Sequence, residues 1–482
     1  MSREFDVCII GGGVTGCAIA RELTRYQLTI AILEKQSDVA EGTTKANSAI
    51  VHSGYDAKPG SLKAKYNVAG SKIFEQWCHE LDVAYKRNGS LVLAFSEDDL
   101  PALEQLLERG QQNGVTGLSI LDRDQLQARE PSVSPDAVYA LLAETGAICS
   151  PYDLTIRLAE HAVVNGAELF TDCKVNLVEK AGSGFSLQTD KGSFSCRTVV
   201  NAAGVYADEI NNQISEDKFA ITPRRGQYWM LDKACGPVFS STVFQLPTKL
   251  GKGVLVTPTV EGTIILGPTA EDISDKDDVD TTAEELDKIL VKASRSWPNI
   301  PRNCFITAFA GIRAHCDRDD FIVGESRDVT GYYLAAGIES PGLTAAPAIA
   351  VELAELIVER LDARLAGDFR QAPPAIISFR ESSNEERRRL ISEDPAYGRL
   401  ICRCEQVSEA EIRSSIRRPA GARTVDAVKR RTRAGMGRCQ GGFCLPSVIR
   451  ILSEELGLEP TEITKFGKDS KVLTGWLGGD QK

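Results

Sequence analysis

Residues 5–34 place an apolar run, a cluster of glycines and a second apolar run in close succession. The first run covers residues 7–10, glycines follow at positions 11, 12, 13 and 16, and apolar residues then recur at helical spacing until a second run ends at Glu34. Short apolar runs on either side of an amphipathic segment are typical of parallel strands joined by a helix. The pattern therefore predicts a strand, a tight turn, a helix and a second strand.

The residue types in this turn suit a nucleotide phosphate. Gly11 permits the tight turn, Gly13 lets the backbone approach a pyrophosphate, and Gly16 lets the helix pack closely on the strand. The helix N-terminus adds unpaired N–H groups and a positive dipole end. Glu34 has the spacing of the acidic residue that binds a ribose 2′-hydroxyl, and its carboxylate disfavours NADP. The pattern predicts a dinucleotide site, with an ordinary glycine-rich turn as the competing interpretation, and it leaves FAD and NAD both open.

Further along the chain, hydrophobic periodicity separates helices from strands. The glycine, serine, threonine and asparagine content of residues 41–70 predicts a loop rich in hydrogen-bond donors, suited to wrapping a cofactor. Helical spacing predicts helices at residues 61–81, 97–113 and 154–165. Apolar runs predict a strand at 90–95 and another at 167–178, which we expect to continue the first sheet.

Two later segments, residues 197–209 and 332–357, repeat the order of strand, small-residue turn and helix. Between them, residues 219–310 carry alternating apolar positions, as in GQYWML and GTIILG, which predict an antiparallel sheet with one solvated or ligand-facing side. Proline and charge mark residues 366–400 as a connecting segment. Residues 401–455 then form a small module of their own.

Composition excludes several classes of protein. The 482 residues carry 56 basic and 67 acidic side chains, a net charge of −11, which argues against nucleic acid as a partner. No apolar run approaches the roughly 18 residues that span a bilayer. Because the first residues lead directly into the first strand, we expect no signal peptide and a cytoplasmic protein, with any membrane contact made through a partner.

The 13 cysteines do not resemble a secreted disulfide framework. Nine are scattered and suit small buried hydrophobes. Cys402, Cys404, Cys439 and Cys444 are clustered, and four thiolates suit either a [2Fe–2S] cluster or tetrahedral zinc. Zinc ribbons favour two-residue gaps, which neither cysteine pair has, and nearby glycines allow the backbone to fold around sulfide.

With these motifs in place, the sequence resembles the FAD-dependent oxidoreductase superfamily typified by D-amino-acid oxidase. HSGYDAKPGSLKAK and GIESPGLT are similar to segments of L-2-hydroxyglutarate and glycerol-3-phosphate dehydrogenases. The resemblance covers about residues 1–360 and implies FAD rather than NAD. It also implies an α/β fold in which a discontinuous Rossmann-like FAD domain (1–85, 145–215 and 305–365) meets an antiparallel-sheet substrate domain of α+β type (86–144 and 216–304).

The resemblance also assigns cofactor contacts residue by residue. Four groups of residues are implied. The first, in the glycine loop and helix start, holds the pyrophosphate; the second meets the ribose and adenine and closes the nucleotide pocket; the third lies along the cofactor; and the fourth meets the flavin. The implied residues are Gly11, Gly13, Val14, Thr15 and Gly16; Glu34, Lys35 and Val175, with Ala203 and Gly204; Thr43, Thr44, Asn47 and Ser48; and Gly342, Leu343 and Thr344.

The C-terminal part resembles a second family. ICRCEQVSEAEI and KRRTRAGMGRCQGGFC are similar to the bacterioferritin-associated ferredoxin-like module of anaerobic glycerol-3-phosphate dehydrogenase large subunits. This resemblance favours [2Fe–2S] over zinc at the four cysteines. We place the module at 399–455, after a linker at 366–398 and before a tail at 456–482.

Basic residues crowd this module. Lys429, Arg430, Arg431, Arg433 and Arg438 fall within ten positions. Two interpretations remain open, a solvated helix face and a docking surface for an acidic redox partner.

Oxidation of a secondary alcohol at a flavin requires a base for the hydroxyl proton. Of the four histidines, His52 lies at the family's HSG position and is the candidate base or flavin-contacting donor, unless it only orders its loop. His79 and His161 lie in helical stretches that suit surface or core roles. His315 lies two positions after Arg313, so a strand would turn both to one face.

An anionic substrate also requires a cation. Arg313, in FAGIRAHCDRDD, matches the arginine that the family brings over the substrate, with a structural salt bridge as the alternative. Arg225 is a second candidate cation. The stretch from Gly337 to Gly342 departs from the usual glycerol-3-phosphate dehydrogenases, which carry a lysine after the paired glycines of this third segment, so phosphate binding is less secure.

Together these features predict an FAD-dependent dehydrogenase that oxidises an anionic secondary alcohol, with sn-glycerol 3-phosphate and dihydroxyacetone phosphate as the first choice of substrate and product. Electrons would pass through a [2Fe–2S] cluster to a redox partner protein, a membrane-associated subunit or quinone. The alternatives are L-2-hydroxyglutarate oxidation, amine or amino-acid oxidation, and an electron-relay subunit without its own substrate.

Overall fold

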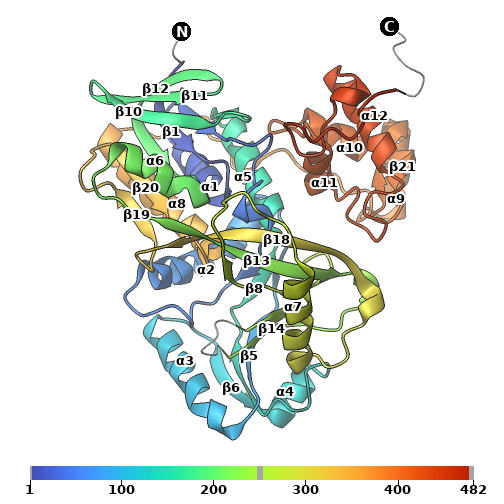
Figure 1. The fold of residues 1–482 in the computed structure, drawn as a ribbon. Coiled ribbons are helices and arrows are strands. Elements are labelled where there is room, and N and C mark those ends of the chain that lie inside the picture. Colours follow the sequence, from blue (N-terminus) through green and yellow to red (C-terminus); the bar gives the residue numbers. More distant parts are fainter. Residues whose placement is uncertain (1–2, 247–252, 477–482) are drawn as a thin grey trace.

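The computed structural model describes residues 3–246 and 253–476. In it the chain forms two large sheets and a small C-terminal module that stands to one side (Figure 1). Within these residues no helix is long and apolar enough to cross a membrane.

The first sheet has a parallel centre built on the N-terminal unit. β1 (Arg3–Ile10) and β2 (Ile30–Leu33) pair in parallel, and α1 (Val14–Leu23) connects them. The other parallel strands are β12 (Gly192–Asn201), β20 (Tyr332–Ala336) and β9 (Glu168–Phe170). The order β20–β12–β1–β2–β9 is that of an open, Rossmann-like sheet, as predicted.

The same sheet has an antiparallel extension. β10 (Val175–Ala181) and β11 (Gly184–Thr189) form a hairpin on the first half of β12, and β19 (Ile322–Glu325) pairs with β20. The single strand predicted at 167–178 is therefore two strands at opposite edges of the sheet. The chain turns between them at Asp172, whose φ is 48°, and Cys173 N–H donates to the Glu34 carbonyl.

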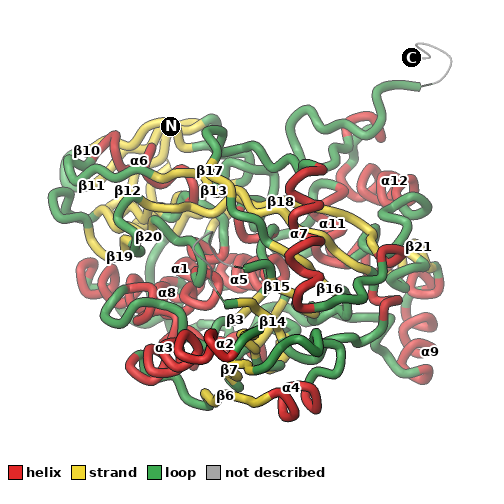
Figure 2. Tube along the Cα trace, turned by 60° about the horizontal axis from the view of Figure 1, so that its bottom comes forward, coloured by secondary structure: helices red, strands yellow, loops and turns green. Residues whose placement is uncertain are grey.

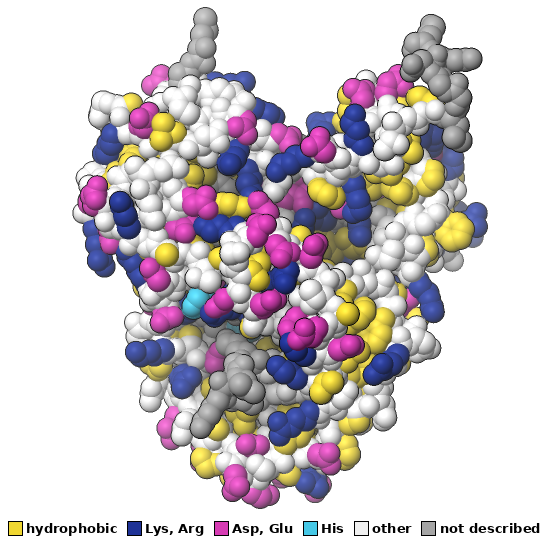
Figure 3. All heavy atoms as spheres, in the orientation of Figure 1, with side chains coloured by type: hydrophobic (Ala, Val, Ile, Leu, Met, Phe, Trp, Pro, Cys, Tyr) yellow, Lys and Arg dark blue, Asp and Glu magenta, His cyan; other side chains and the backbone are white. Residues whose placement is uncertain are grey.

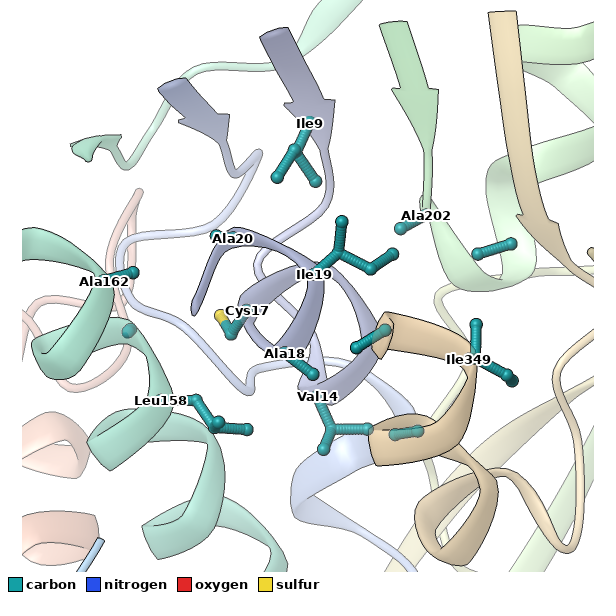
Figure 4. Close-up of a cluster of buried hydrophobic side chains, with 14 of the residues drawn as sticks. Ile9, Val14, Cys17, Ala18, Ile19, Ala20, Leu158, Ala162, Ala202 and Ile349 are labelled. Atoms are coloured by element: carbon teal, nitrogen blue, oxygen red, sulfur yellow. The ribbon is translucent and has the colours of Figure 1, made fainter. Parts of the chain in front are cut away.

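Helices with small residues on their contact faces cover this sheet. α1 packs between α5 (Pro151–Val164) and α8 (Gly342–Leu361), and Figure 4 shows Cys17 and Val14 on the side of α1 toward Leu158, with Ile19 toward Ile9 and Ala202 at the sheet. α2 (Leu62–Glu80) packs against α8. Ser61 caps α2 by accepting a hydrogen bond from Ala64 N–H. The helices predicted around residues 61–81 and 154–165 are confirmed.

The second sheet is mostly antiparallel and is built on β13 (Ile221–Leu231) and β18 (Phe305–Cys316), which pair along their length. Its remaining strands are β17 (Glu271–Asp272), β16 (Ile264–Gly267), β15 (Leu255–Pro258), β14 (Thr242–Gln245), β5 (Ser90–Ala94), β7 (Tyr139–Ala143) and β6 (Leu118–Asp122). The antiparallel sheet predicted from alternating positions is confirmed, with further strands from residues 90–143. A separate small sheet joins β3 (Ile50–Val51), β8 (Ala147–Cys149) and β4 (Tyr85–Arg87).

One helix on this sheet was not predicted. α7 (Ala283–Ser296) lies across the strands in Figure 2 and packs against β13 and β16. Thr282 caps it, and Leu286, Ile289 and Ala293 form its buried stripe, an i, i+3, i+7 pattern. α3 (Leu100–Gln112) and α4 (Arg123–Arg129) also pack on this sheet, whereas α6 (Ala207–Ile214) packs on β10 and β12 of the first sheet.

The C-terminal module has a hydrophobic core of its own. Its elements are β21 (Leu400–Cys402), β22 (Val407–Ser408), α10 (Glu409–Arg417), α11 (Val425–Thr432) and α12 (Leu445–Leu456), preceded by α9 (Asn384–Glu393). Ile412, Val428 and Ile451 are buried at its centre. Ile463 joins the same core, so part of the predicted tail packs on the module, while residues 477–482 lie outside the described residues.

Candidate active site and metal centre

The predicted cofactor residues gather at the carboxyl ends of the parallel strands. Gly11 follows β1, Glu34 follows β2, Ala203 lies two residues after β12, and Gly342 opens the helix that follows β20. Ligands of open α/β sheets bind in the crevice outside these strand ends. The sheet order thus brings segments from three distant parts of the chain to one edge.

The glycine loop is too crowded for side chains at two positions. Gly11 has a φ of 110°, and a Cβ there would stand 2.4 Å from the carbonyl oxygen of Ala202. At Gly16 a Cβ would stand 2.0 Å from the carbonyl oxygen of Gly11. These contacts hold the N-terminus of α1 against the turn, the geometry in which its N–H groups face an anion.

Glu34 points back at the glycine loop. Its carboxylate accepts hydrogen bonds from Gly12 N–H at 2.7 Å and from Gln36 N–H at 2.8 Å. Burial raises the pKa of Glu34, although both N–H groups act in the opposite direction. Lys35 lies over the Tyr206 ring, 3.6 Å from its centroid, which places it beside Ala203 and Gly204. Val175 starts β10, and its contact with adenine remains a prediction.

Residues 43–48, which we call the cofactor loop, connect the two sheets. Thr44 Oγ1 accepts a hydrogen bond from Val14 N–H at 3.1 Å, and Thr43 Oγ1 donates to the Ile312 carbonyl on β18 at 2.5 Å. Asn47 Nδ2 donates to the Thr44 carbonyl at 2.8 Å and keeps the loop folded, with Ser48 half-buried beside it. The loop therefore runs from the pyrophosphate end of the predicted site to the second sheet.

His52 lies at the far end of this path. Its N–H donates to Thr344 Oγ1 at 2.8 Å, which ties the HSG segment to the start of α8, where Gly342 and Leu343 also lie. Its ring faces Phe244 on β14, with centroids 6.0 Å apart. The imidazole thus lies between the predicted flavin contacts and the second sheet, where a base would meet a substrate.

Arg313 lies on the face of β18 that the cofactor loop touches. Gly311, two residues earlier on the same face, is in such close contact with the loop that a Cβ would meet the Ala46 carbonyl oxygen at 1.9 Å. Arg313 donates to the Thr269 carbonyl at 2.7 Å and forms no ion pair with any residue in the described ranges. The structure therefore gives no support to the alternative that Arg313 forms a structural salt bridge. Some of its guanidinium N–H groups remain available for an anion.

Arg225 does not join Arg313. In the β13–β18 register Arg313 lies opposite Arg224, whereas Arg225 lies opposite Ile312, so the two arginines point to opposite faces. Arg225 is buried and forms ion pairs with Asp278 at 2.6 Å and Glu271 at 2.9 Å. We expected Arg225 to be a second cation facing the substrate. Its two ion pairs give it a structural role instead.

An ion cluster beside Arg313 was missed from the sequence. Lys63 Nζ donates to Glu339 Oε1 at 2.8 Å, and His315 Nδ1 lies 3.3 Å from the same oxygen. Burial acts to raise the pKa of Glu339, but Lys63 and His315 hold it below its usual value. Lys63, at the start of α2, thus brings a cation to Glu339. His315 and Arg313 share one face, as predicted.

The other two histidines have structural positions. His161 is buried, accepts a hydrogen bond from Arg21 at 3.2 Å, and lies 2.7 Å from the Arg370 carbonyl. Burial lowers its pKa to about 4. His79 is exposed on α2. Both outcomes agree with the core and surface roles expected for them.

The four clustered cysteines form two pairs. Cys404 Sγ and Cys439 Sγ are 3.7 Å apart, close to the separation of two sulfurs bound to one tetrahedral metal at about 2.3 Å. A hydrogen bond from Cys444 lowers the pKa of Cys402 to about 6, and the same contact raises the pKa of Cys444. Within residues 3–246 and 253–476 no three ligating side chains surround a single point. Two pairs suit the two irons of a [2Fe–2S] cluster better than one zinc ion.

Backbone groups complete this cradle. A Cβ at Gly437 would lie 2.3 Å from Cβ of Cys404. Burial acts to raise the pKa of Cys439, but hydrogen bonds from the N–H groups of Gly441, Phe443 and Gly442 and from Cys404 together lower it. These N–H groups donate to the cysteine sulfur and favour its thiolate form, as backbone donors around iron–sulfur clusters do.

Most of the basic residues near the cysteines face inward. Arg430 is buried against Asp38 and Glu41, and Arg431 pairs with Asp38. Neither interpretation of the basic cluster, a solvated face or a docking surface, holds for these arginines.

A second contact fixes the C-terminal module to the second sheet. Glu405, next to Cys404, is buried and receives Lys233 at 3.0 Å, Arg380 at 3.3 Å and Arg433 at 3.0 Å. These cations come from the end of β13, the connecting segment and the module itself. Through Glu405, the segment that carries Cys404 thus contacts three parts of the chain.

Comparison with known proteins agrees with this geometry. Residues 6–356 match the family described as FAD dependent oxidoreductase, and residues 400–454 match the BFD-like [2Fe-2S] binding domain. The chain therefore belongs to the FAD-dependent oxidoreductase family and carries a [2Fe–2S]-binding domain at its C-terminal end. FAD and a [2Fe–2S] cluster are its cofactors, and the crowded glycine loop and the paired thiols fit them.

Individual proteins are also similar to this chain. The chain is 51% identical over 474 residues to a glycerol 3-phosphate dehydrogenase of Caloramator mitchellensis, covering 98% of each chain. It is 33% identical over 274 residues to an L-2-hydroxyglutarate dehydrogenase of Indibacter alkaliphilus, covering 55% of this chain and 68% of that one. The dithionite-reduced L-α-glycerophosphate oxidase of Mycoplasma pneumoniae, solved with FAD bound, superposes with a TM-score of 0.74 at 31% identity, covering 78% of this chain and 100% of that one.

Proposed function

We propose that the protein is a dehydrogenase that oxidises sn-glycerol 3-phosphate to dihydroxyacetone phosphate and delivers the electrons through its [2Fe–2S] cluster to a redox partner. The observation that carries the substrate is the 51% identity to a glycerol 3-phosphate dehydrogenase along 98% of both chains, because both halves of the molecule are included. Arg313 supports it, since a guanidinium without a carboxylate partner suits a phosphate.

FAD bound at the strand ends supplies the acceptor for the hydride from carbon 2 of the substrate. His52 takes the proton of the 2-hydroxyl group, so that loss of hydride and proton together leaves the ketone. Arg313 holds the phosphate with two parallel N–H···O bonds and thereby sets the distance of carbon 2 from the cofactor. Glu339 keeps Lys63 and His315 in place beside this phosphate.

An anaerobic substrate panel tests the proposal. We expect sn-glycerol 3-phosphate to bleach the flavin absorbance of the purified holoenzyme, while L-2-hydroxyglutarate and an amino acid such as proline leave it unchanged, because Arg313 and the neighbouring cations suit a phosphate. Bleaching by L-2-hydroxyglutarate alone would assign the second candidate, which the 33% identity to such a dehydrogenase favours. No response to any donor would point to an electron-relay subunit.

Electrons leave, in this proposal, at the exposed side of the cluster. Cys404 is exposed, and Phe443 beside the second cysteine pair has 86% of its surface accessible. Arg403 and Arg438 are exposed and form no ion pair within the described part of the chain. An exposed apolar side chain and two unpaired arginines on the same module suit an acidic one-electron carrier.

Replacing Cys439 with serine separates the two half-reactions. We expect flavin reduction by substrate to stay within twofold of wild type, while turnover with a one-electron acceptor falls at least tenfold because the cluster is lost. Anaerobic stopped-flow absorbance and iron content measure both. Cys235→Ser is the matched control, as Cys235 is half-buried in the short helical turn that follows β13 and is not one of the four clustered cysteines. If Cys439→Ser loses flavin reduction by substrate while Cys235→Ser keeps it, the proposed division of the two half-reactions between flavin and cluster is contradicted.

A further inference from the structure

The loop between Glu34 and the cofactor loop is held from two sides. This acidic loop, residues 35–41, meets the glycine loop through a hydrogen bond from Ala40 N–H to the Gly12 carbonyl at 2.9 Å. Gly12 in turn donates to Glu34. On its other side the acidic loop meets the C-terminal module, which the space-filling view shows joined to the rest of the molecule below a notch (Figure 3).

The contact with the module is a buried ion cluster. Arg430 donates to Asp38 Oδ2 and to Glu41 Oε1, each at 2.7 Å, and the three side chains are only 6%, 5% and 4% exposed. Arg431 binds both oxygens of Asp38, at 2.6 and 2.8 Å. Ser37 Oγ adds a hydrogen bond to the Phe466 carbonyl at 2.9 Å. Two carboxylates and two guanidinium groups balance in charge.

The acidic loop cannot keep this conformation alone. Without the arginines, Asp38 and Glu41 would be buried anions, with Lys45 at 2.6 Å as the remaining partner of Glu41. Buried charges that lose their partners are strongly unfavourable, so the loop would open to water. Opening moves Ala40 away from Gly12 and releases Thr43 and Thr44, which directly follow the loop.

We propose that the [2Fe–2S] module forms part of the FAD site, because Arg430 and Arg431 hold the acidic loop in the conformation that places the glycine loop and the cofactor loop around FAD. FAD binding and module docking are then coupled, and by linkage each strengthens the other by the same factor. The module has a structural role in addition to carrying electrons. The solved glycerophosphate oxidase with FAD bound aligns over its whole length with 78% of this chain.

Arg430→Met in the full-length protein tests the coupling. We expect the dissociation constant of FAD, measured by flavin fluorescence on protein with its flavin removed and its iron retained, to rise at least tenfold. Arg438→Met, which removes an exposed arginine of the same module, should change it less than twofold. Arg430→Met with wild-type iron content and wild-type FAD affinity would overturn the proposal.

Hydrogen exchange on the wild-type protein gives an independent readout if Arg430→Met folds poorly. Adding FAD to the flavin-free protein should slow amide exchange in α11, which carries Arg430 and Arg431, more than in α12, which lies behind it in the module core. Equal protection of both helices, or none, would overturn the coupling, because it would show no specific path through the ion cluster.

Discussion

Replacing His52 with asparagine is expected to lower kcat for glycerol 3-phosphate by about 10² to 10⁴-fold, the usual contribution of a general base. The backbone N–H that binds Thr344 is unchanged by the substitution, so the start of α8 and FAD binding should remain intact. Because a base must be unprotonated to act, the wild-type rate should fall on the acid side of its pH profile, and the variant should lose that limb.

The same experiment distinguishes a base from a residue that orders its loop. His79→Asn, an exposed change on α2, is the control and should leave kcat within twofold. If His52→Asn instead releases FAD and keeps its acid limb, the imidazole serves the loop rather than the chemistry. Steady-state kinetics across pH, with the flavin absorbance recorded for each variant, gives both results.

Replacing Arg313 with methionine is expected to raise KM for glycerol 3-phosphate and lower kcat/KM by about 10² to 10⁴-fold. Two charge-assisted hydrogen bonds to the phosphate disappear, each worth roughly 1.5–3 kcal/mol, and about 1.4 kcal/mol corresponds to tenfold. Arg313→Lys should fall between wild type and Arg313→Met, because an ammonium keeps the charge but loses the bidentate geometry.

Arg318→Met is the matched control, since Arg318 lies five residues further on and pairs with Asp217 at the surface. It should leave KM unchanged. A KM for Arg313→Met equal to wild type would remove Arg313 from the substrate site, and the phosphate would then have to meet Lys63 or His315. Initial rates with a soluble acceptor at saturating concentration measure these constants.

Local sequence signals predicted the parts of the fold that depend on neighbouring residues. The glycine loop, Glu34 and the two later strand–turn–helix segments were found because each repeats a short pattern of apolar run and small residues. Their meeting at one sheet edge follows from parallel pairing, which the repeated pattern implies. The paired cysteines were likewise visible as a cluster in the sequence.

The errors come from contacts that the local pattern does not contain. Arg225 and Arg313 both lie on long strands of one sheet, and only the register shows that they face opposite sides. Arg430 and Arg431 look like a solvated helix face until Asp38 and Glu41, nearly four hundred positions earlier, are brought against them. Lys63 could have been found by asking which cation might pair with Glu339, since a buried carboxylate needs one.

The three cations on Glu405 have a consequence for how electrons travel. Some redox proteins carry charge on a domain that swings between donor and acceptor. Here such a swing would pull Lys233 and Arg380 away from a carboxylate with almost no access to water, which is strongly unfavourable. We therefore expect the flavin and the cluster to keep a fixed separation through the catalytic cycle. Electrons would then reach the acceptor by diffusion of the external carrier and not by movement of the C-terminal module.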